Sequence, residues 1–235
     1  MSIRRRSAYP RRARDERLRL TENGTFQISV FSDLHFAEGT TTNSNNYFEV
    51  LTIFKDDKAD NKTIGVMNSV LSSEEVQLVV LNGDLISGEA TTQRSNSSLY
   101  VDRIVAPLVD RNLPWASTYG NHDSEINLDP EEIFHEETKY ENSLTQRRVS
   151  GSTAGITNYY LPIFPHASND STPVFILWFF DSQGGHYALA GDEDRKSVAR
   201  QSWVDDKVST TALMQSRDGL AHLILDAGIS CRIFT

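Results

Sequence analysis

The chain has 235 residues, a formal net charge of −9 at pH 7 and a single cysteine. This length allows one domain with tails and a sizeable core. The acidic balance excludes nucleic-acid binding through a generally basic surface, and one cysteine excludes an intrachain disulfide framework. No apolar run reaches the roughly 18 residues that a membrane span requires. Residues 1–20 are rich in arginine and have no apolar stretch, so they do not fit a secretory signal. We therefore expect a cytoplasmic protein in which residues 1–24 form a basic, disordered arm. A targeting segment and an artefact of gene prediction are the alternatives for the basic start.

The first predicted element is a β-strand over residues 25–31, which runs directly into a polar exit with Asp33 and His35. Side chains alternate along an extended segment, so an Asp-x-His pair places both ligands on the same side. Residues 37–62 are polar and weakly periodic, which predicts a long loop with an apolar island at residues 47–54.

The next elements follow the order of a parallel sheet. A helix is predicted over residues 63–71, where apolar residues recur at helical spacing. Residues 78–81 are all apolar and predict a short buried strand that runs through Gly83 into Asp84. A carboxylate just past the end of such a strand lies where open α/β sheets bind their ligands. A second helix over residues 99–110 completes the strand-helix-strand pattern of a parallel sheet.

A third predicted strand, residues 113–119, ends in Gly120 and is followed by Asn121, His122 and Asp123. Any one of the strand-end residues could be a turn cap or an ordinary loop histidine. Three strands that all end in such residues indicate a site for two metal ions instead. Carboxylate, imidazole and amide oxygen together suit Mn, Fe or Zn better than Ca.

The second half of the chain predicts one helix and two further strands. The helix spans residues 129–140, because Asp129 can cap its first turn and Pro130 fits the first helical position. His135 is expected on its surface. The strands span residues 158–164 and 174–180, and we expect their large aromatic residues to lie in the core: Tyr159, Tyr160, Trp178, Phe179 and Phe180.

The strand-end residues resemble the first three motifs of the calcineurin-like metallophosphoesterase superfamily. These motifs are Asp33 with His35, Gly83 with Asp84, and the run at 120–123. The surrounding sequence is similar to the fungal and plant phosphatases often labelled purple-acid-phosphatase-like, over residues 26–208.

The resemblance implies an α/β fold: a two-sheet sandwich of the metallophosphoesterase type, flanked by helices and incomplete at the C-terminus. Residues 25–208 would form the phosphoesterase domain, and residues 209–235 a divergent or truncated tail. The later strands, at 158–164 and 174–180, would belong to the second sheet.

The resemblance also implies a set of metal ligands. Asp33 and His35 would bind the first ion, Asp84 would bridge both ions, and Asn121 would bind the second. Two divalent ions (Mn, Fe or Zn) would clamp the phosphoryl oxygens and activate a bridging water as the attacking hydroxide. Purple members of the family carry a tyrosine three residues after the bridging aspartate. Ser87 stands there in this chain, which argues against a purple iron–tyrosinate site.

Two further residues receive roles from the same resemblance. His122 would face the substrate and either stabilise the phosphoryl charge or protonate the leaving oxygen. Asp123 would orient the His122 ring. The substrate would be a phosphate ester or a phosphoprotein.

The resemblance breaks after these motifs. The family takes its remaining ligands from a histidine after a further strand and from a Gly-His-x-His turn, and no such turn follows Asp123. His186 follows a glycine, but residue 188 is alanine. His222 is the only downstream candidate, and an ordinary strand or helix histidine is the favoured explanation for it. The second metal site is therefore expected to be weak. Two functions remain: a metal-dependent phosphoesterase, or a catalytically weak or inactive phosphatase-like scaffold.

Overall fold

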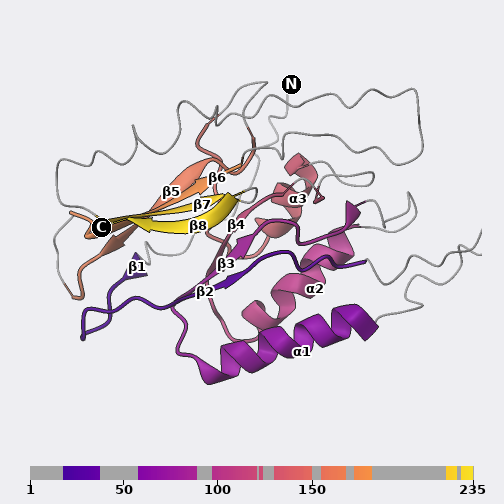
Figure 1. Cartoon of the computed structure of the whole chain (residues 1–235), viewed down its shortest axis with the longest axis horizontal. Helices are drawn as coiled ribbons and strands as arrows, with labels where there is room; N and C mark the ends of the chain where they lie inside the picture. The colour runs from indigo at the N-terminus through magenta and orange to yellow at the C-terminus, as the bar shows by residue number, and fades with distance from the viewer. Residues whose placement is uncertain are drawn as a thin grey trace, which may run out of the picture.

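The computed structural model describes residues 18–37, 58–88, 97–120, 122–123, 130–149, 155–167, 172–181, 221–226 and 229–234. Its helices are α1 (Lys58–Ser73), α2 (Ser97–Val109) and α3 (Pro130–Glu137). Its strands are β1 (Leu18–Arg19), β2 (Ile28–Phe31), β3 (Leu78–Asn82), β4 (Trp115–Thr118), β5 (Tyr159–Phe164), β6 (Phe175–Phe180), β7 (Ala221–Asp226) and β8 (Ile229–Phe234). The layers are helices, a three-stranded sheet and a five-stranded sheet (Figure 1). This confirms the predicted α/β class and two-sheet sandwich.

The three-stranded sheet positions the candidate site. Its order is β2-β3-β4, and both pairs are parallel. Ile28 pairs with Leu78 and Val79 with Trp115, which confirms the three predicted strands. β2 and β4 are shorter than predicted, and β3 is one residue longer. Because all three strands run the same way, their carboxyl ends meet at one edge of the sheet.

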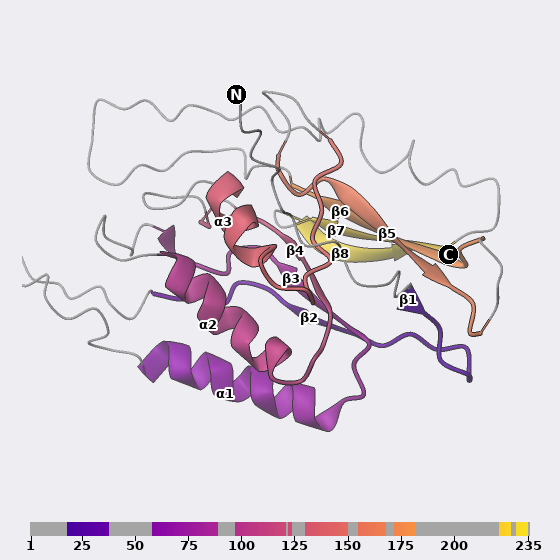
Figure 2. The same cartoon turned by 180° about the vertical axis from the view of Figure 1, so that it is seen from behind.

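The central strand β3 is buried on both faces, as its unbroken apolar sequence predicts. Val79 and Leu81 pack in a cluster with residues of the helices, such as Ile104. Leu78 and Val80 pack instead against the five-stranded sheet. Figure 2 shows the same order from behind, with β2–β4 between α1 and α2 on one side and β5–β8 on the other. Two cores therefore hold this sheet from both sides.

The five-stranded sheet has the order β1-β5-β6-β7-β8, with β5 and β6 antiparallel. Tyr159 stacks on Phe179 in the inner core, with ring centroids 4.5 Å apart. Tyr160 and Trp178 are only half-buried, so the expectation that they lie in the core is wrong. They alternate with Tyr159 and Phe179 along the strands and therefore point to the opposite face.

Residues 18–24, part of the predicted arm, are included among the described residues. Leu18 pairs with Ile163 of β5 and packs against the inner core. Burial of this apolar side chain stabilises the folded state. Residues 1–17 and the apolar island at 47–54 lie outside the described residues.

Helix α1 begins at Lys58, so the predicted loop over residues 37–62 is wrong for its last residues. The start depends on a long-range contact rather than on local periodicity. Asp60 is buried, accepts a hydrogen bond from the Ala37 backbone N–H, and forms an ion pair with Arg103 of α2 (3.1 Å).

The other two helices lie where the sequence predicts them, with different ends. Helix α2 contains Pro107 in its last turn. Helix α3 is shorter than predicted, and Asp129 lies outside the described residues. His135 is exposed on α3, as predicted. None of α1, α2 and α3 combines the length and the apolar character needed to cross a membrane.

Candidate metal centre

Three of the four predicted ligands meet at the carboxyl edge of the three-stranded sheet. Asp33 and His35 follow β2, and Asp84 follows β3. One potential ligand atom from each residue lies within 4.8 Å of the others. The fourth predicted ligand, Asn121, lies outside the described residues. Two carboxylates and one imidazole at this spacing suit a divalent transition metal.

The backbone at this edge adopts an unusual conformation. Asp33, His35 and Asp84 have φ angles of 54°, 48° and 49°, in the left-handed region, and Gly83 has a φ of 76°. For residues other than glycine this conformation costs on the order of 1 kcal/mol or more and is concentrated at functional sites. All three residues of the ligand cluster therefore carry this strain, and Ala37 in the same loop as His35 shares it at a φ of 78°.

Main-chain hydrogen bonds between the first two loops hold this conformation. The His35 N–H donates to the Asp84 carbonyl (3.1 Å), and the Phe36 N–H donates to the Leu85 carbonyl (2.9 Å). The Ser87 N–H donates back to the Phe36 carbonyl (2.9 Å). The loops after β2 and β3 therefore continue the parallel pairing beyond the ends of the strands.

Ser87 also contacts His35 through its side chain. Its Oγ is hydrogen-bonded to His35 Nδ1 at 2.8 Å, and Ser87 is 1% exposed. The His35 and His122 rings lie with centroids 5.2 Å apart at an angle of 65°. In the sequence, Ser87 is notable only because it stands where purple members of the family carry a tyrosine. The contact joins residues 52 positions apart, so no local pattern could indicate it.

The loop after β4, which carries His122, contacts Asp84. The His122 N–H donates to Asp84 Oδ1 (3.0 Å), and the Gly88 N–H donates to the His122 carbonyl (3.0 Å). A Cβ added at Gly120 would lie 2.1 Å from Asp84 Oδ1, far inside van der Waals contact. Only glycine allows β4 to end this close to the bridging candidate.

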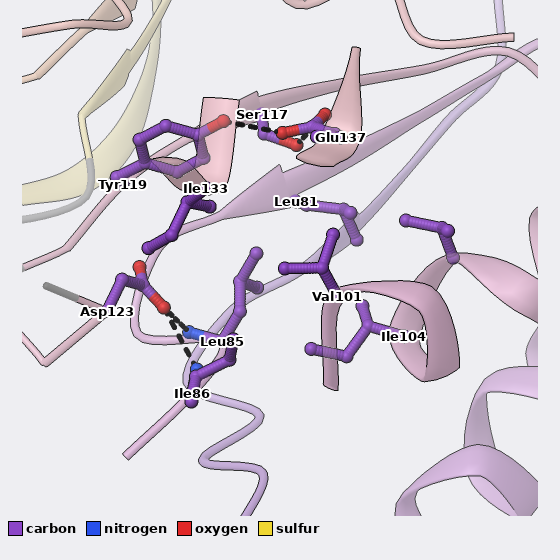
Figure 3. A pocket seen from close by; sticks show the side chains of 11 residues that line it. Leu81, Leu85, Ile86, Val101, Ile104, Ser117, Tyr119, Asp123, Ile133 and Glu137 are labelled. Carbon is purple, nitrogen blue, oxygen red and sulfur yellow. Dashed lines mark hydrogen bonds between the residues drawn. The ribbon is translucent and has the colours of Figure 1, made fainter. Parts of the chain in front are cut away.

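Asp123 fastens the second loop to the third. Its Oδ1 accepts hydrogen bonds from the N–H groups of Leu85 (2.7 Å) and Ile86 (2.9 Å), shown as dashed lines in Figure 3. Its Oδ2 accepts one from the Gly120 N–H (2.8 Å). Burial raises the pKa of Asp123 to about 7, although these three hydrogen bonds act in the opposite direction. The contacts described for Asp123 are with the main chain, so its predicted role in orienting the His122 ring stays a prediction.

A second buried carboxylate, Glu137 of α3, lines the same small cavity as Asp123 (Figure 3). Every other side chain of β4 and its exit donates to it, because these residues point to the same face. Its five donors are Trp115 Nε1 (2.8 Å), Ser117 Oγ (2.7 Å), Tyr119 Oη (2.8 Å), Ser143 Oγ (3.3 Å) and Thr145 Oγ1 (2.6 Å). We refer to Glu137 and these donors as the Glu137 cluster.

The Glu137 cluster was not predicted from the sequence. Glu137 is 2% exposed, although it sits in an acidic run on a short helix. The available signal was its position four residues after the buried Ile133, on the same helix face. Burial, followed by the nearby Glu137 charge, raises the pKa of Tyr119 well above its usual value.

A cavity of ≈ 20 Å³ separates Asp123 from Glu137 (Figure 3). This is room for about one water molecule, so the cavity is not a substrate site. Asp33, by contrast, is exposed, so the ligand cluster is open to solvent on the side of β2.

His222, the downstream candidate ligand, lies in β7 and pairs in register with Ile176 of β6. Its backbone therefore belongs to the five-stranded sheet, whereas the ligand cluster lies at the end of the three-stranded sheet.

The fold and the site together define an α/β sandwich protein with a candidate metal centre at the carboxyl ends of parallel strands. Comparison with known proteins makes this class more specific. Residues 26–213 match the family described as calcineurin-like phosphoesterase. The chain belongs to this family.

The relatives include one protein named as a phosphatase and others named as inactive. Phosphatase DCR2 of Saccharomyces cerevisiae is 34% identical over 71% of this chain and 28% of its own length. "Probable inactive purple acid phosphatase 29" of Arabidopsis thaliana is 30% identical over 85% of this chain and 51% of its own length. An uncharacterized protein of Schizosaccharomyces pombe is 30% identical over 80% of this chain and 34% of its own length. The matched regions thus cover between about a quarter and a half of these relatives. No solved structure matches the chain significantly.

Proposed function

We propose that this chain is a metal-dependent phosphoesterase that hydrolyses phosphate esters, either small esters or a phosphoprotein. The observation that carries the proposal is the convergence of Asp33, His35 and Asp84 within 4.8 Å at the carboxyl edge of a parallel sheet. Membership of the calcineurin-like phosphoesterase family supports it.

The residues of this edge divide the work between binding and proton handling. Asp33, His35 and Asp84 would hold the divalent ions, with Asn121 as a further ligand of the second. Such ions lower the pKa of a bound water and neutralise phosphoryl charge. His122 lies beside the His35 ring, at 5.2 Å between centroids. Its imidazole can therefore donate a hydrogen bond to an oxygen of an ester bound at the cluster.

The second candidate is a phosphatase-like scaffold with little or no activity. One observation favours it. Several relatives are named as probable inactive purple acid phosphatases.

Hydrolysis of p-nitrophenyl phosphate by the full chain with added Mn²⁺ separates the two candidates. The phosphoesterase predicts turnover that is lost in Asp84→Asn and kept in Asp110→Asn, which changes an exposed aspartate at the end of α2. A folded wild-type chain that binds Mn²⁺ without turnover would instead support the scaffold. Turnover that survives Asp84→Asn would contradict the proposed site.

A further inference from the structure

We propose that Ser87 is a positioning residue for the metal ligand His35, and that its hydroxyl determines which ring nitrogen faces the ion. The proposal rests on the proposed function, because it takes His35 as a ligand. It assigns a role to a residue outside the ligand set.

The geometry of this pair is fixed by the main chain. Ser87 Oγ lies 2.8 Å from His35 Nδ1. The Ser87 N–H donates to the carbonyl of Phe36, the neighbour of His35, at 2.9 Å. Phe36 and Ile86 also form a parallel bridge between the two loops. The hydroxyl is therefore held in place by the same backbone pairing that carries His35.

Burial makes this contact selective. Ser87 is 1% exposed, so bulk water has little access to its hydroxyl and does not readily replace either partner. The left-handed backbone of His35, at φ 48°, fixes the direction of its Cβ. The hydrogen bond to Ser87 then restrains the rotation of the ring about its own side-chain bonds.

The chemistry of imidazole gives the contact its consequence. A neutral histidine has one N–H donor and one nitrogen with a free lone pair, and only the latter binds a metal ion. When Nδ1–H of His35 donates to Ser87 Oγ, the lone pair on Nε2 is the one left for the ion. The opposite tautomer would place a proton on Nε2. An outer hydrogen bond of this kind typically contributes about 10- to 100-fold to metal affinity.

Calorimetric titration of the full chain with Zn²⁺ tests the role without any assay of turnover. Ser87→Ala is expected to weaken Zn²⁺ binding by about 10- to 100-fold. Ser87→Thr keeps the hydroxyl and should recover most of the affinity. Ser143→Ala is the matched control: Ser143 is also buried, and its hydroxyl contacts Glu137 at 3.3 Å rather than the ligand cluster. Its Zn²⁺ affinity should stay within about twofold of wild type.

Nitrogen-15 spectroscopy of Zn²⁺-loaded wild-type chain gives a second readout that needs no variant to fold. The long-range spectrum of His35 should show a protonated Nδ1 and a metal-bound Nε2. A metal-bound Nδ1 would overturn the proposal. So would a folded Ser87→Ala chain with wild-type affinity, or an equal loss in Ser143→Ala.

These outcomes are distinct from those of the proposed function. A wild-type chain that binds Zn²⁺ through His35 Nε2 but hydrolyses nothing would refute the enzyme and leave the role of Ser87 supported. A wild-type chain that binds no ion at His35 would refute both.

Discussion

Two groups of ionisable side chains adjoin the three-stranded sheet, and they are built in opposite ways. The ligand cluster lies at the carboxyl edge and includes the exposed Asp33, whereas Glu137 is buried beside β4. At the ligand cluster, Asp33 accepts a hydrogen bond from Ser32 and Asp84 accepts one from the His122 backbone. In the Glu137 cluster, a single carboxylate accepts five hydrogen bonds.

The backbone differs in the same sense. All three residues of the ligand cluster (Asp33, His35 and Asp84) have backbone φ angles in the left-handed region. No described residue of the Glu137 cluster has a positive φ. A carboxylate whose oxygens already accept hydrogen bonds from several protein donors has no lone pairs left to bind a metal ion. Backbone strain is concentrated at functional sites, and the Glu137 cluster shows none. The comparison teaches that Glu137 stabilises the scaffold, while Asp33, His35 and Asp84 are kept available for a ligand.

Replacement of Glu137 should have the largest effect on stability. Glu137→Ala leaves five buried donors without their acceptor, so we expect the free energy of unfolding to fall by about 4 kcal/mol or more. Urea denaturation followed by circular dichroism measures this. The neighbouring Glu136 pairs with Lys139 at the surface, and Glu136→Ala should cost less than about 1 kcal/mol. Similar losses in both variants would show that the Glu137 cluster is not the anchor we describe.

Replacement of Asp123 tests the joint between the two regions. Asp123→Ala removes the acceptor of three backbone N–H groups at a position that is 3% exposed. We expect a loss of about 3 kcal/mol in the free energy of unfolding. Mn²⁺ binding should also weaken, because the loop that carries Asp84 loses its hydrogen bonds to Asp123. The exposed Asp110→Ala should change stability by less than about 0.5 kcal/mol. Unchanged Mn²⁺ affinity in folded Asp123→Ala would separate this residue from the site.

A change at Gly120 disturbs the ligand cluster directly. In Gly120→Ala the added Cβ would lie 2.1 Å from Asp84 Oδ1. This overpacking should lower the free energy of unfolding by about 2 kcal/mol and should displace the Asp84 carboxylate. Calorimetric Mn²⁺ titration should show at least a tenfold loss, by analogy with other disturbed metal-site neighbours.

The matched control for this glycine is Gly65 in α1. A Cβ there meets nothing within 4 Å, and the position is exposed in a helix interior. Gly65→Ala should therefore raise the free energy of unfolding by about 0.5–1 kcal/mol and leave Mn²⁺ binding unchanged. If the two alanine variants bind Mn²⁺ equally well, the close approach at Gly120 has no bearing on the site.

The smallest effect appears only at high pH. Burial, followed by the Glu137 charge, raises the pKa of both Tyr119 and Tyr159 well above the usual value. The folded chain then holds these protons more tightly than the unfolded chain. Their contribution to stability is complete below about pH 10 and falls above it by about 1.4 kcal/mol per pH unit and residue.

Phenolate absorbance measures this directly. Tyr119 and Tyr159 should ionise together with unfolding, while the urea-unfolded chain should titrate all eight tyrosines in one step near their usual pKa. Tyr159→Phe should make stability less dependent on pH above 10. Free ionisation of both residues in the folded chain would contradict the burial of their side chains.

Local patterns foresaw much of the fold and the ligand cluster. Residues 78–81 are apolar without a break, and this is enough to predict a strand buried on both faces. Asp33, His35 and Asp84 each stand just past such a strand, and parallel strands bring their ends together. These features depend on near neighbours in the chain, so the sequence alone carries them.

Other features depend on contacts between distant residues, and no local pattern carries those. The early start of α1 rests on Asp60 meeting Ala37 and Arg103. Leu18 could not be assigned to a sheet before its partner Ile163 was known.

The sequence by itself determined the order of the elements from β2 to β6 and the chemical character of the ligand residues, because hydrophobic periodicity and strand-end chemistry are local. Only the tertiary structure decided which groups those residues meet. It joined Ser87 to His35 across 52 positions and gathered five donors around Glu137. Packing of the helices and loops on the sheet brings these pairs together, since nothing between them along the chain specifies their distance.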